Sequence, residues 1–340
     1  MYISDLGSQD HVQSPLVSII IVNWNHEQYL KKCLDSLSNQ NFRDFDICIV
    51  DNGSTDGSGE WIANNSRELN TVSFPDNRGF SKAFNWGVKH TSGEFVLSLN
   101  PDVFVEQNFL QEIVNSMNQD ENVGIVSPKL LRVEDATIID STGLFINRFR
   151  RPYDRGQGEI DKGQYDNSFQ IFGACGAAAL YRRAMLVDIA LHDEFFDEDF
   201  FAYYEDADLA WRAQLRGWNA RYAPKAVATH VRGWGDTLHK RNKLSKDNVG
   251  PRLALRNRWI MILKNDALRY FLLDFPSIVV MEFSRLLYMA IFAPDALWGL
   301  RDILASSRHA RDKRKIIRDR MLVNDASLRP WFIAEKIQHQ

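Results

Sequence analysis

Acidic segments of this chain carry carboxylates at positions where they could bind a ligand or take part in a reaction. An apolar run that ends at Leu99 is followed by Asp102, and a second run that ends at Val50 is followed at once by Asp51. The carboxyl ends of parallel strands meet at one edge of an α/β sheet, where such sheets bind ligands. We therefore expect Asp51 and Asp102 to face one crevice.

The two carboxylates suit different tasks. Asp51 could accept a hydrogen bond from the imide N–H that uracil and thymine share and adenine lacks, or it could only organise the turn that follows it. Asp102 offers hard oxygen ligands through which Mg²⁺ or Mn²⁺ could bridge the protein and a diphosphate, or it could form the turn after Pro101. His230, at the end of a late apolar run, could add a nitrogen ligand and favour Mn²⁺, although a single histidine more often belongs to a core or its rim.

A third acidic segment, residues 197–208, alternates carboxylates with aromatic side chains, which distinguishes it from a disordered charged tail. Asp206 begins a predicted helix, where a carboxylate can act as a cap. Packed among aromatic rings, the same carboxylate could have its pKa raised enough to act as a general base on a hydroxyl. We expect Asp208 to support the helix and to pair with Arg212 one turn later.

Arg78 stands between Asn77 and Gly79 in a turn that precedes another predicted helix. A guanidinium near a helix N-terminus is well placed to meet an anionic phosphate. The alternative is an arginine that contacts only solvent. Lys82, one turn further along, is expected at the surface.

The elements that must position these residues alternate along the chain. From Val17 onward, short β-branched runs alternate with amphipathic segments, which predicts an α/β fold with a mostly parallel sheet flanked by helices. Strands are predicted at residues 17–22, 45–50, 71–74, 94–99, 123–128, 172–182 and 220–230. Helices are predicted at residues 27–37, 56–64, 80–89, 105–117 and 206–216. Residues 147–168 are predicted to form a long loop over the site.

Composition excludes several classes of protein. The 340 residues are 45% hydrophobic and 25% charged, which is enough to bury a large core. A net charge of −3 gives no reason to expect nucleic acid as a partner. The three cysteines are scattered without CxxC spacing, which argues against a disulfide framework or a zinc site and fits a reducing compartment.

The chain is predicted to divide into three parts. Residues 1–14 form a flexible leader that lacks the basic start and apolar core of a signal peptide, residues 15–235 a catalytic domain, and residues 236–340 a helical extension. Charged residues and a proline interrupt the apolar stretch 270–293, so we expect a buried or surface-lying helix there rather than a membrane span. The basic, aromatic segments 252–264 and 301–320 would either face solvent, meet a partner subunit, or contact an anionic membrane surface.

Six motifs occur in an order that is similar to family 2 of the inverting glycosyltransferases, which have the GT-A fold. The similarity covers about residues 15–235, and the short motifs are specific only in combination. It extends to rhamnosyltransferase-like members, which have a similar Asn-Pro-Asp turn. The motifs are Val17-Ser18-Ile19-Ile20-Ile21-Val22-Asn23-Trp24-Asn25, Val50-Asp51-Asn52-Gly53-Ser54-Thr55-Asp56, Asn77-Arg78-Gly79, Leu99-Asn100-Pro101-Asp102, Glu205-Asp206-Ala207-Asp208-Leu209 and His230.

This resemblance implies roles for the matching residues. Asp51 resembles the aspartate that recognises the base, and Asp206 the catalytic base of the Glu205-Asp206 pair. Asp102 resembles the last, metal-binding acid of a DXD motif, with His230 as an additional metal ligand. By the same resemblance, the donor nucleotide sugar would also contact Asn77, Arg78 and Asn100. Asn100 replaces the first aspartate of DXD, and its amide is a poorer metal ligand than a carboxylate.

The resemblance implies an inverting glycosyltransferase that uses Mn²⁺ or Mg²⁺. It would move a sugar, with rhamnose as first candidate, from a dTDP- or UDP-sugar to a hydroxyl of a polysaccharide or lipid-linked glycan. A cytoplasmic location follows, with peripheral contact to the inner face of the plasma membrane as an option. A sugar nucleotidylyltransferase is the first alternative, but residues 23–27 lack the glycine-rich loop such enzymes need. The second is a peripheral membrane adaptor with a degenerate pocket, with Asn100 as the sign of decay, but the intact Glu205-Asp206 pair argues against it.

Overall fold

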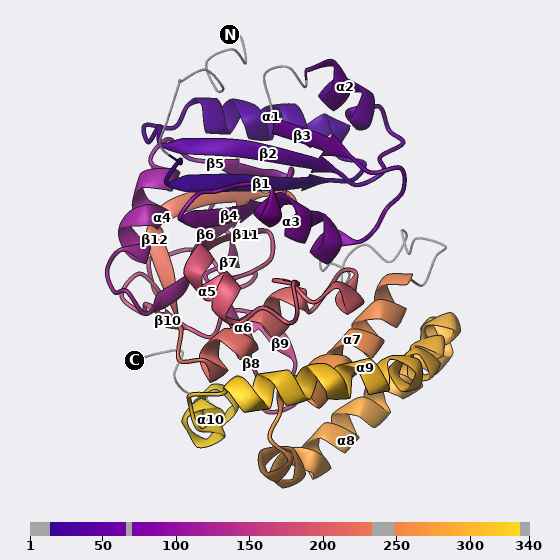
Figure 1. Cartoon of the computed structure of the whole chain (residues 1–340). Coiled ribbons are helices and arrows are strands. Elements are labelled where there is room, and N and C mark those ends of the chain that lie inside the picture. The colour runs from indigo at the N-terminus through magenta and orange to yellow at the C-terminus, as the bar shows by residue number, and fades with distance from the viewer. Residues whose placement is uncertain (1–13, 66–69, 233–248, 334–340) are drawn as a thin grey trace.

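A computed structural model describes residues 14–65, 70–232 and 249–333. Its centre is a mixed sheet with the strand order β10-β12-β6-β11-β4-β1-β2-β3, to which β5 adds beside β12 and β7 beside β6 (Figure 1). The strands are β1 Val17–Asn23, β2 Phe45–Asp51, β3 Asn70–Ser73, β4 Phe95–Leu99, β5 Val103–Val105, β6 Val123–Arg132, β7 Ile139–Ser141, β10 Gln170–Ile171, β11 Ala178–Arg182 and β12 Asn219–His230. A separate hairpin pairs β8 Leu144–Ile146 with β9 Pro152–Asp154. The predicted α/β class with a mostly parallel sheet is confirmed.

Helices cover both faces of this sheet. Alternate residues of β1 supply two apolar clusters: Ile19 packs on the side of α1 and α4, and Ile20 on the side of α3 and α6. Both faces of β1 are buried, which explains why its sequence is mostly apolar and does not alternate with exposed polar residues. Figure 1 shows α1 and α3 on opposite sides of the strands. These helices are α1 Glu27–Ser38, α2 Ser58–Asn64, α3 Phe80–Lys89, α4 Phe109–Met117, α5 Arg183–Asp188 and α6 Glu205–Leu215.

The strand register brings the predicted site residues to one edge. β1 runs parallel to both β2 and β4, and Asn23 at the end of β1 lies opposite Asp51 at the end of β2. β11 runs antiparallel to β4, with Ala178 opposite Leu99, so β11 begins where β4 ends. The ends of β1, β2 and β4 and the start of β11 therefore share one edge of the sheet.

Three segments differ from the sequence prediction. The helix predicted at 105–117 begins at Phe109, because residues 103–105 form β5 and pair with the end of β12. The strand predicted at 172–182 is confined to β11, residues 178–182, and β10 precedes the predicted range, because the residues between β10 and β11 turn toward α6. There, a Cβ on Gly173 would lie 2.4 Å from the Cβ of Ala210. The predicted loop 147–168 contains β9, which pairs with β8.

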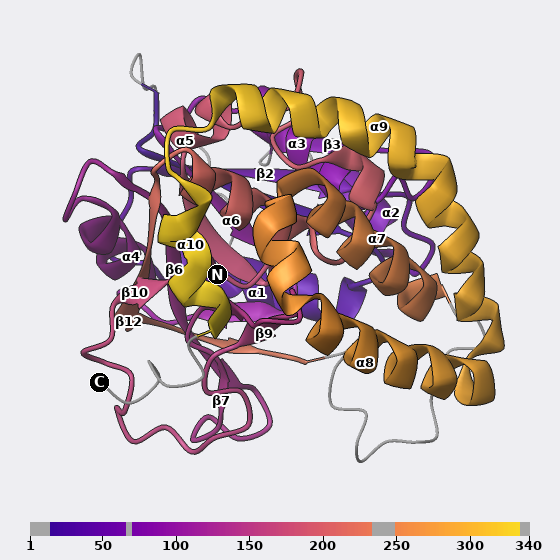
Figure 2. The same ribbon diagram turned by 90° about the horizontal axis from the view of Figure 1, so that it is seen from below.

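Four helices follow β12 in the described part of the chain. They are α7 Val249–Asn265, α8 Leu268–Phe292, α9 Gly299–Arg320 and α10 Asp325–Ile333. Seen from below, α8 and α9 lie at the outside of the molecule, with α7 inside them (Figure 2). Met261 of α7 and Ile317 of α9 belong to the same apolar cluster as α3 and α6. Residues 1–13 and the expected boundary near Trp234 lie outside the described residues, so the division into domains stays a prediction.

The helix α8 runs unbroken through Pro276, and it is long and apolar enough to cross a membrane by length and composition alone. The expected buried or surface-lying helix at 270–293 stays a prediction. One expectation for α7 needs correction: the basic segment 252–264 does not present all of its cations to solvent, a partner or a membrane, because the side chains of Arg258 and Lys264 are buried. Arg258 pairs with Glu282 of α8, with 2.5 Å between Nη1 and Oε2. These two residues of α7 are therefore not available to a membrane.

Candidate active site

Asp51 is held at the end of β2 by its neighbours. Its Oδ1 accepts hydrogen bonds from Nδ2 of Asn23 at 3.0 Å and from Oγ of Ser54 at 2.6 Å. Its side chain is buried. The carboxylate thus organises the turn that follows β2, which is the alternative that the sequence left open. Recognition of a base by Asp51 stays a prediction.

The loop that carries Arg78 is tied to the same turn. Nδ2 of Asn52 donates to Oδ1 of Asn77 at 3.0 Å, and Oδ1 of Asn52 accepts from the backbone N–H of Arg78 at 2.9 Å. The guanidinium of Arg78 lies 5.1 Å from the ring centroid of Phe74, with Nε 3.3 Å from Oδ1 of Asp76. The side chain of Arg78 is 40% exposed, so it can meet an anion from solvent.

Gly79 follows Arg78 with a positive φ of +84°, a conformation that L side chains rarely adopt. A Cβ there would also lie 2.6 Å from the ring of Phe201, so the loop approaches residue 201 closely. Lys82 is half exposed, as expected, with its Nζ 3.9 Å from Glu198.

Asp102 lies between two histidines. Its Oδ1 is 3.7 Å from Nε2 of His230, and its Oδ2 is 4.0 Å from Nε2 of His26, at the start of α1. Burial raises the pKa of Asp102, against the opposing influence of the two histidines. Oδ1 of Asp102 and Nδ1 of His26 are buried and have no hydrogen-bond partner among the described residues. A buried carboxylate oxygen left in this way marks a place for a ligand.

His230 is oriented by Asp140. Nδ1 of His230 lies 2.8 Å from Oδ2 of Asp140, which also pairs with Arg232. Burial alone would lower the pKa of His230, but the bond to Asp140 and the charge of Asp102 raise it above its usual range. The carboxylate of Asp140 thus accepts a hydrogen bond from Nδ1 of His230, and Nε2 is the nitrogen that faces Asp102. In metal sites, a carboxylate commonly accepts a hydrogen bond from the ring nitrogen that does not bind the metal, and this bond fixes the orientation of the histidine.

The donor set fits a metal ion that is shared with a ligand. Within the described ranges, no group of three or more His, Cys, Asp or Glu side chains is arranged to hold a metal ion. Asp102 and His230 would supply two donors, and a diphosphate could supply the hard oxygen ligands that Mg²⁺ or Mn²⁺ still needs. The backbone N–H of Asn100 donates to the carbonyl of Ala177 at 2.9 Å and so fixes the turn before Asp102.

Asp206 lies in the first turn of α6 and is half-buried. Its Oδ2 accepts a hydrogen bond from the backbone N–H of Gly176 at 3.0 Å, and its Oδ1 accepts one from Ala207 at 2.7 Å. Burial raises the pKa of Asp206, and the charge of Asp154 adds to this, while the two backbone N–H groups oppose it. The adjacent Glu205 is buried, and burial together with the charge of Asp206 raises its pKa as well. Asp206 is the more accessible carboxylate of the pair.

Residues 175–177 join the second and third acidic segments. Gly176 donates to Asp206, and Ala177 accepts from Asn100, two residues before Asp102. The Asp206 carboxylate and the Asn100-Pro101-Asp102 turn are therefore attached to neighbouring residues of one short segment. Asp51 lies at the same edge of the sheet, at the end of β2.

The loop before α6 is held by the C-terminal helices. Phe201, Tyr203 and Tyr204 have φ values of 62°, 70° and 70°, which are uncommon for residues other than glycine. The side-chain Nδ2 of Asn257 in α7 donates to the carbonyls of Phe200, Ala202 and Tyr203 at 2.8, 2.8 and 2.9 Å. This single amide fixes the backbone directly before Glu205.

Lysines reinforce the same region. Lys264 of α7 bonds to the buried Asp197 and lies 2.9 Å from Asp208, while Lys313 of α9 lies 2.6 Å from Asp197. The predicted pair between Asp208 and Arg212 is confirmed, with 2.9 Å between Oδ2 and Nε.

Sequence reasoning missed His26, Asp140 and Asn257. His26 follows the end of β1 and could have been found by the same argument that selected Asp51. Asp140 acts through a contact with a residue 90 positions away, and Asn257 through contacts with residues 54 to 57 positions away; nothing in their local sequence indicates these partners.

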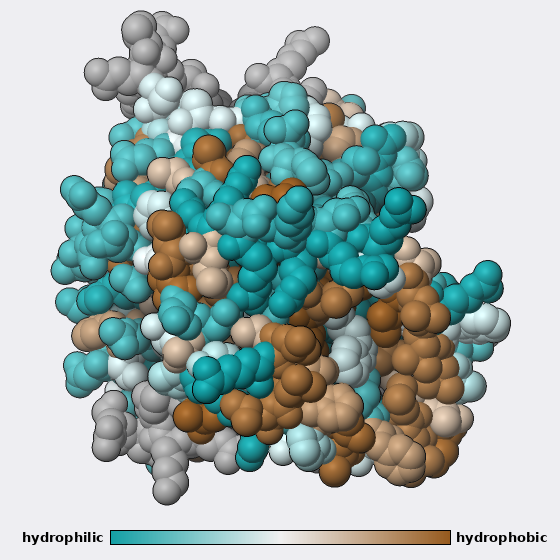
Figure 3. Space-filling view, turned by 60° about the horizontal axis from the view of Figure 1, so that its bottom comes forward, coloured by the Kyte–Doolittle hydropathy of each residue, from teal (hydrophilic) through white to brown (hydrophobic). Residues whose placement is uncertain are grey.

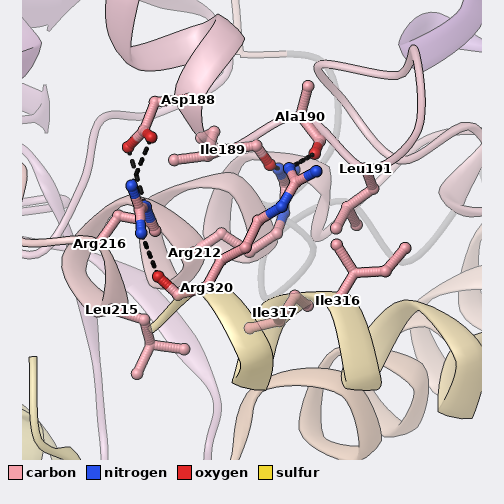
Figure 4. Close-up of a pocket in the computed structure, with 10 residues that line it drawn as sticks. All are labelled: Asp188, Ile189, Ala190, Leu191, Arg212, Leu215, Arg216, Ile316, Ile317 and Arg320. Carbon is pink, nitrogen blue, oxygen red and sulfur yellow. Dashed lines mark hydrogen bonds and ion pairs between the residues drawn. The ribbon is translucent and has the colours of Figure 1, made fainter. Parts of the chain in front are cut away.

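A small pocket elsewhere contains none of these acids (Figure 4). It lies between the end of α6, the residues after α5, and α9. Its polar groups bond to one another: Arg216 to Asp188, and Arg320 to the carbonyl of Ala190 at 3.0 Å. The pocket is therefore a gap between packed elements and not part of the candidate active site. It is lined by Asp188, Ile189, Ala190, Leu191, Arg212, Leu215, Arg216, Ile316, Ile317 and Arg320.

Comparison with known proteins identifies the class. The chain matches Glycosyl transferase family 2 over residues 18–189, which is just over half of its length. It therefore belongs to that family. The low-salt glycan biosynthesis hexosyltransferase Agl10 of Haloferax volcanii is 25% identical over 218 residues, which are 63% of this chain and 66% of Agl10. The chain spans between 14% and 66% of the length of the curated relatives that it matches first.

Solved structures share the fold. The mannosyltransferase PcManGT from Pyrobaculum calidifontis, in complex with GDP-Man and Mn²⁺, has a TM-score of 0.52 and 18% identity, covering 89% of this chain and 78% of PcManGT. S. aureus TarS 1-349 in complex with UDP-GlcNAc has a TM-score of 0.54 and 18% identity, covering 89% and 90% of the two chains. The GT-A fold expected from the sequence is confirmed.

Proposed function

We propose that this protein is an inverting, metal-dependent glycosyltransferase. It transfers a sugar, with rhamnose as the first candidate, from a dTDP- or UDP-sugar to a hydroxyl of a polysaccharide or lipid-linked glycan. One observation carries the proposal: the Asp206 carboxylate and the turn of Asp102 are attached to neighbouring residues, Gly176 and Ala177. A base and a site for a diphosphate thus lie together, as displacement at an anomeric carbon requires.

In the proposed reaction, Asp206 accepts the proton of the acceptor hydroxyl as its oxygen attacks the anomeric carbon. The bond from that carbon to the diphosphate breaks, and attack from the opposite face inverts the configuration. The raised pKa of Asp206 makes it a stronger base than an ordinary aspartate. The neighbouring Glu205, buried and with a raised pKa, would remain protonated. Asp206 would then be the ionised carboxylate of the pair.

Asp102 and His230 would hold Mg²⁺ or Mn²⁺, which when bound would offset the charge of the departing diphosphate. PcManGT, which shares the fold of this chain, was solved in complex with GDP-Man and Mn²⁺. Arg78, whose guanidinium is reachable from solvent, would contact phosphate, and Asn77 would fix its loop. Asn100 would border the donor.

Asp51 would accept the imide N–H of the base at the end of β2. Its Oδ1 already accepts hydrogen bonds from Asn23 and Ser54, whereas Oδ2 accepts a long bond of 3.4 Å from the backbone N–H of Ser54. Oδ2 is therefore the atom that would accept the bond from the base. We also propose a cytoplasmic location, which the free thiols of Cys33, Cys48 and Cys175 support.

A panel of nucleotide sugars tests the proposal. Thermal shifts are measured with dTDP-rhamnose, UDP-GlcNAc and GDP-mannose, with and without Mn²⁺, and transfer is followed by release of the nucleoside diphosphate. We expect stabilisation by a thymidine or uridine donor that requires the metal, and a product of inverted configuration by NMR. An adaptor would show binding without turnover, and a nucleotidylyltransferase would consume a nucleoside triphosphate. Either result would contradict the proposal.

Asp206→Asn tests the role of the base. The variant keeps the size of the side chain and should retain donor binding while transfer falls by a factor of about 10² to 10⁴, the usual contribution of a general base. Asp193→Asn, an exposed aspartate in the loop after α5, is the matched control. Turnover close to wild type in Asp206→Asn would remove this residue from the role.

A further inference from the structure

The helix α8 packs with the side chains of two acidic residues, Asp274 and Glu282, toward the rest of the molecule. Asp274 is buried and pairs with Arg150, with 2.5 Å between Oδ2 and Nη1. Glu282, eight residues further along, is buried against Arg258 and accepts from Nε1 of Trp259 at 3.0 Å. Two ion pairs on one side of the helix fix its rotation, so the opposite side of a largely apolar sequence faces outward.

Exposed apolar side chains adjoin one another along the outward side of α8, because Val279, Phe283, Leu287 and Ile291 follow at intervals of four residues. Large apolar side chains that are exposed number 22 in the described residues, and 14 of them lie between residues 268 and 304. In Figure 3, where the bottom of the molecule is turned toward the viewer, hydrophobic side chains appear as brown areas in the lower part of the view. We call this surface the α8 face; its members are Leu268, Leu272, Leu273, Phe275, Val279, Val280, Phe283, Leu287, Tyr288, Ile291, Phe292, Trp298, Leu300 and Leu304. Scattered exposed apolar residues are normal, but a contiguous patch of this kind marks an interaction surface.

Basic side chains border the α8 face. Arg269 and Arg301 are exposed and adjacent in sequence to Leu268 and Leu300, and Arg308 is exposed one turn after Leu304. The acids of the same stretch contribute little opposing charge. Asp274 and Glu282 are buried, and Asp302 is paired with Arg252 at 2.6 Å, which leaves Asp295 as the exposed carboxylate.

We propose that the α8 face docks in the plane of an anionic lipid membrane. An in-plane helix buries one apolar side in the lipid while cations at its border meet anionic headgroups. Tyr288 and Trp298 are residue types enriched at such an interface. A membrane-spanning α8 would instead expose Asp274 and Glu282 to lipid and break their ion pairs. A second copy of the chain would present the same cationic border to itself, whereas anionic headgroups neutralise it.

This docking goes beyond the transfer reaction and does not depend on the identity of the donor. If the acceptor is lipid-linked, as the proposed function allows, docking would bring the enzyme to the surface that holds it. The test therefore measures lipid binding without any nucleotide sugar, and its failure is distinct from failure of the donor panel.

Cosedimentation with vesicles tests the proposal, using the full chain and vesicles of phosphatidylcholine alone or mixed with phosphatidylglycerol, at low salt. We expect binding to the mixed vesicles, and weaker binding to phosphatidylcholine. The triple variant Val280→Ser, Phe283→Ser and Ile291→Ser should bind at least tenfold more weakly, because each exposed side chain loses its apolar contact with lipid. Ile160→Ser, an equally exposed site outside the α8 face, should bind as the wild type does.

A charge variant tests the border separately. Arg269→Glu with Arg301→Glu should weaken binding to the mixed vesicles and leave binding to phosphatidylcholine nearly unchanged. Binding that the triple variant does not weaken, or no binding to either vesicle, would overturn the proposal. A concentration-dependent dimer in light scattering that the triple variant abolishes, with no vesicle binding, would also overturn it and assign the α8 face to a second copy.

Discussion

Replacing Asn257 by alanine should detach the loop that precedes the candidate base. The amide of Asn257 donates to three carbonyls of residues 200–203; the bond to Phe200 is buried, and those to Ala202 and Tyr203 are partly buried. Each carbonyl left without a partner costs about 1–3 kcal/mol where water cannot reach it. Since one NH₂ group has two protons, we count two full bonds and expect a loss of about 2–6 kcal/mol, nearer the lower end because two of the carbonyls are only partly buried.

That loss is comparable to the strain that the loop stores. Phe201, Tyr203 and Tyr204 hold left-handed conformations, which cost about 1–3 kcal/mol each and persist only when neighbouring structure enforces them. Without Asn257 the loop should relax and Asp206 should leave its position for part of the time. We expect kcat to fall at least tenfold, because about 1.4 kcal/mol corresponds to that factor. Donor binding should be unchanged, because Asp51 and Arg78 are untouched.

Two measurements check this prediction. Amide hydrogen exchange of residues 200–206 should become faster in Asn257→Ala, and transfer at saturating donor should slow, while the thermal shift produced by the donor persists. Asn115→Ala on the exposed side of α4 is the matched control for loss of an asparagine in a helix. Unchanged exchange together with a kcat within twofold of wild type would refute the reasoning that Asn257 holds the loop.

Three further predictions follow from the site and its supports. Transfer should decline as the pH falls through about 6, since burial raises the pKa of Asp206 to about 6 and only the ionised form accepts a proton; a flat profile between pH 5 and 7, by initial rates, would contradict this. Asp140→Asn should weaken Mn²⁺ binding about 10- to 100-fold by titration calorimetry, because the amide no longer fixes the proton of His230 at Nδ1; unchanged affinity would remove Asp140 from this role. Lys264→Met should lower the free energy of unfolding by about 3–5 kcal/mol in urea titrations, because Asp197 and Asp208 lose a buried cation; an unchanged midpoint and slope would contradict it.

The sheet could be predicted because each of its central strands is indicated by its own short run of sequence. β1, β2 and β4 are mostly apolar runs that are followed by polar residues, so both the strands and the edge that carries Asp51 and Asp102 follow from the sequence. The break between β10 and β11 could not be predicted in the same way. It depends on Gly173 and Gly176, whose missing side chains make room for Ala210 and Asp206 of a helix that is distant in the sequence.

The partners of charged residues in the C-terminal helices could not be predicted for a related reason. Asp274 and Glu282 interrupt an apolar sequence and Lys264 ends a basic one, but hydropathy does not say which side of a helix faces inward. Their partners, Arg150, Arg258 and Asp197, lie 124, 24 and 67 positions away. Once these pairs are known, the interruptions mark the buried side of α8 and the apolar remainder marks its surface.

The adjacency of Asn257 and Arg258 has a consequence for protein engineering. One residue secures the tyrosines ahead of Asp206, and the next is bonded to α8. A shortened enzyme that ends after β12 would keep every family motif and the whole central sheet, yet lose the amide that holds the loop before Asp206, the proposed base. Chimeras that exchange the C-terminal helices between relatives should therefore retain the contact between residue 257 and the loop, or select a new one in its place.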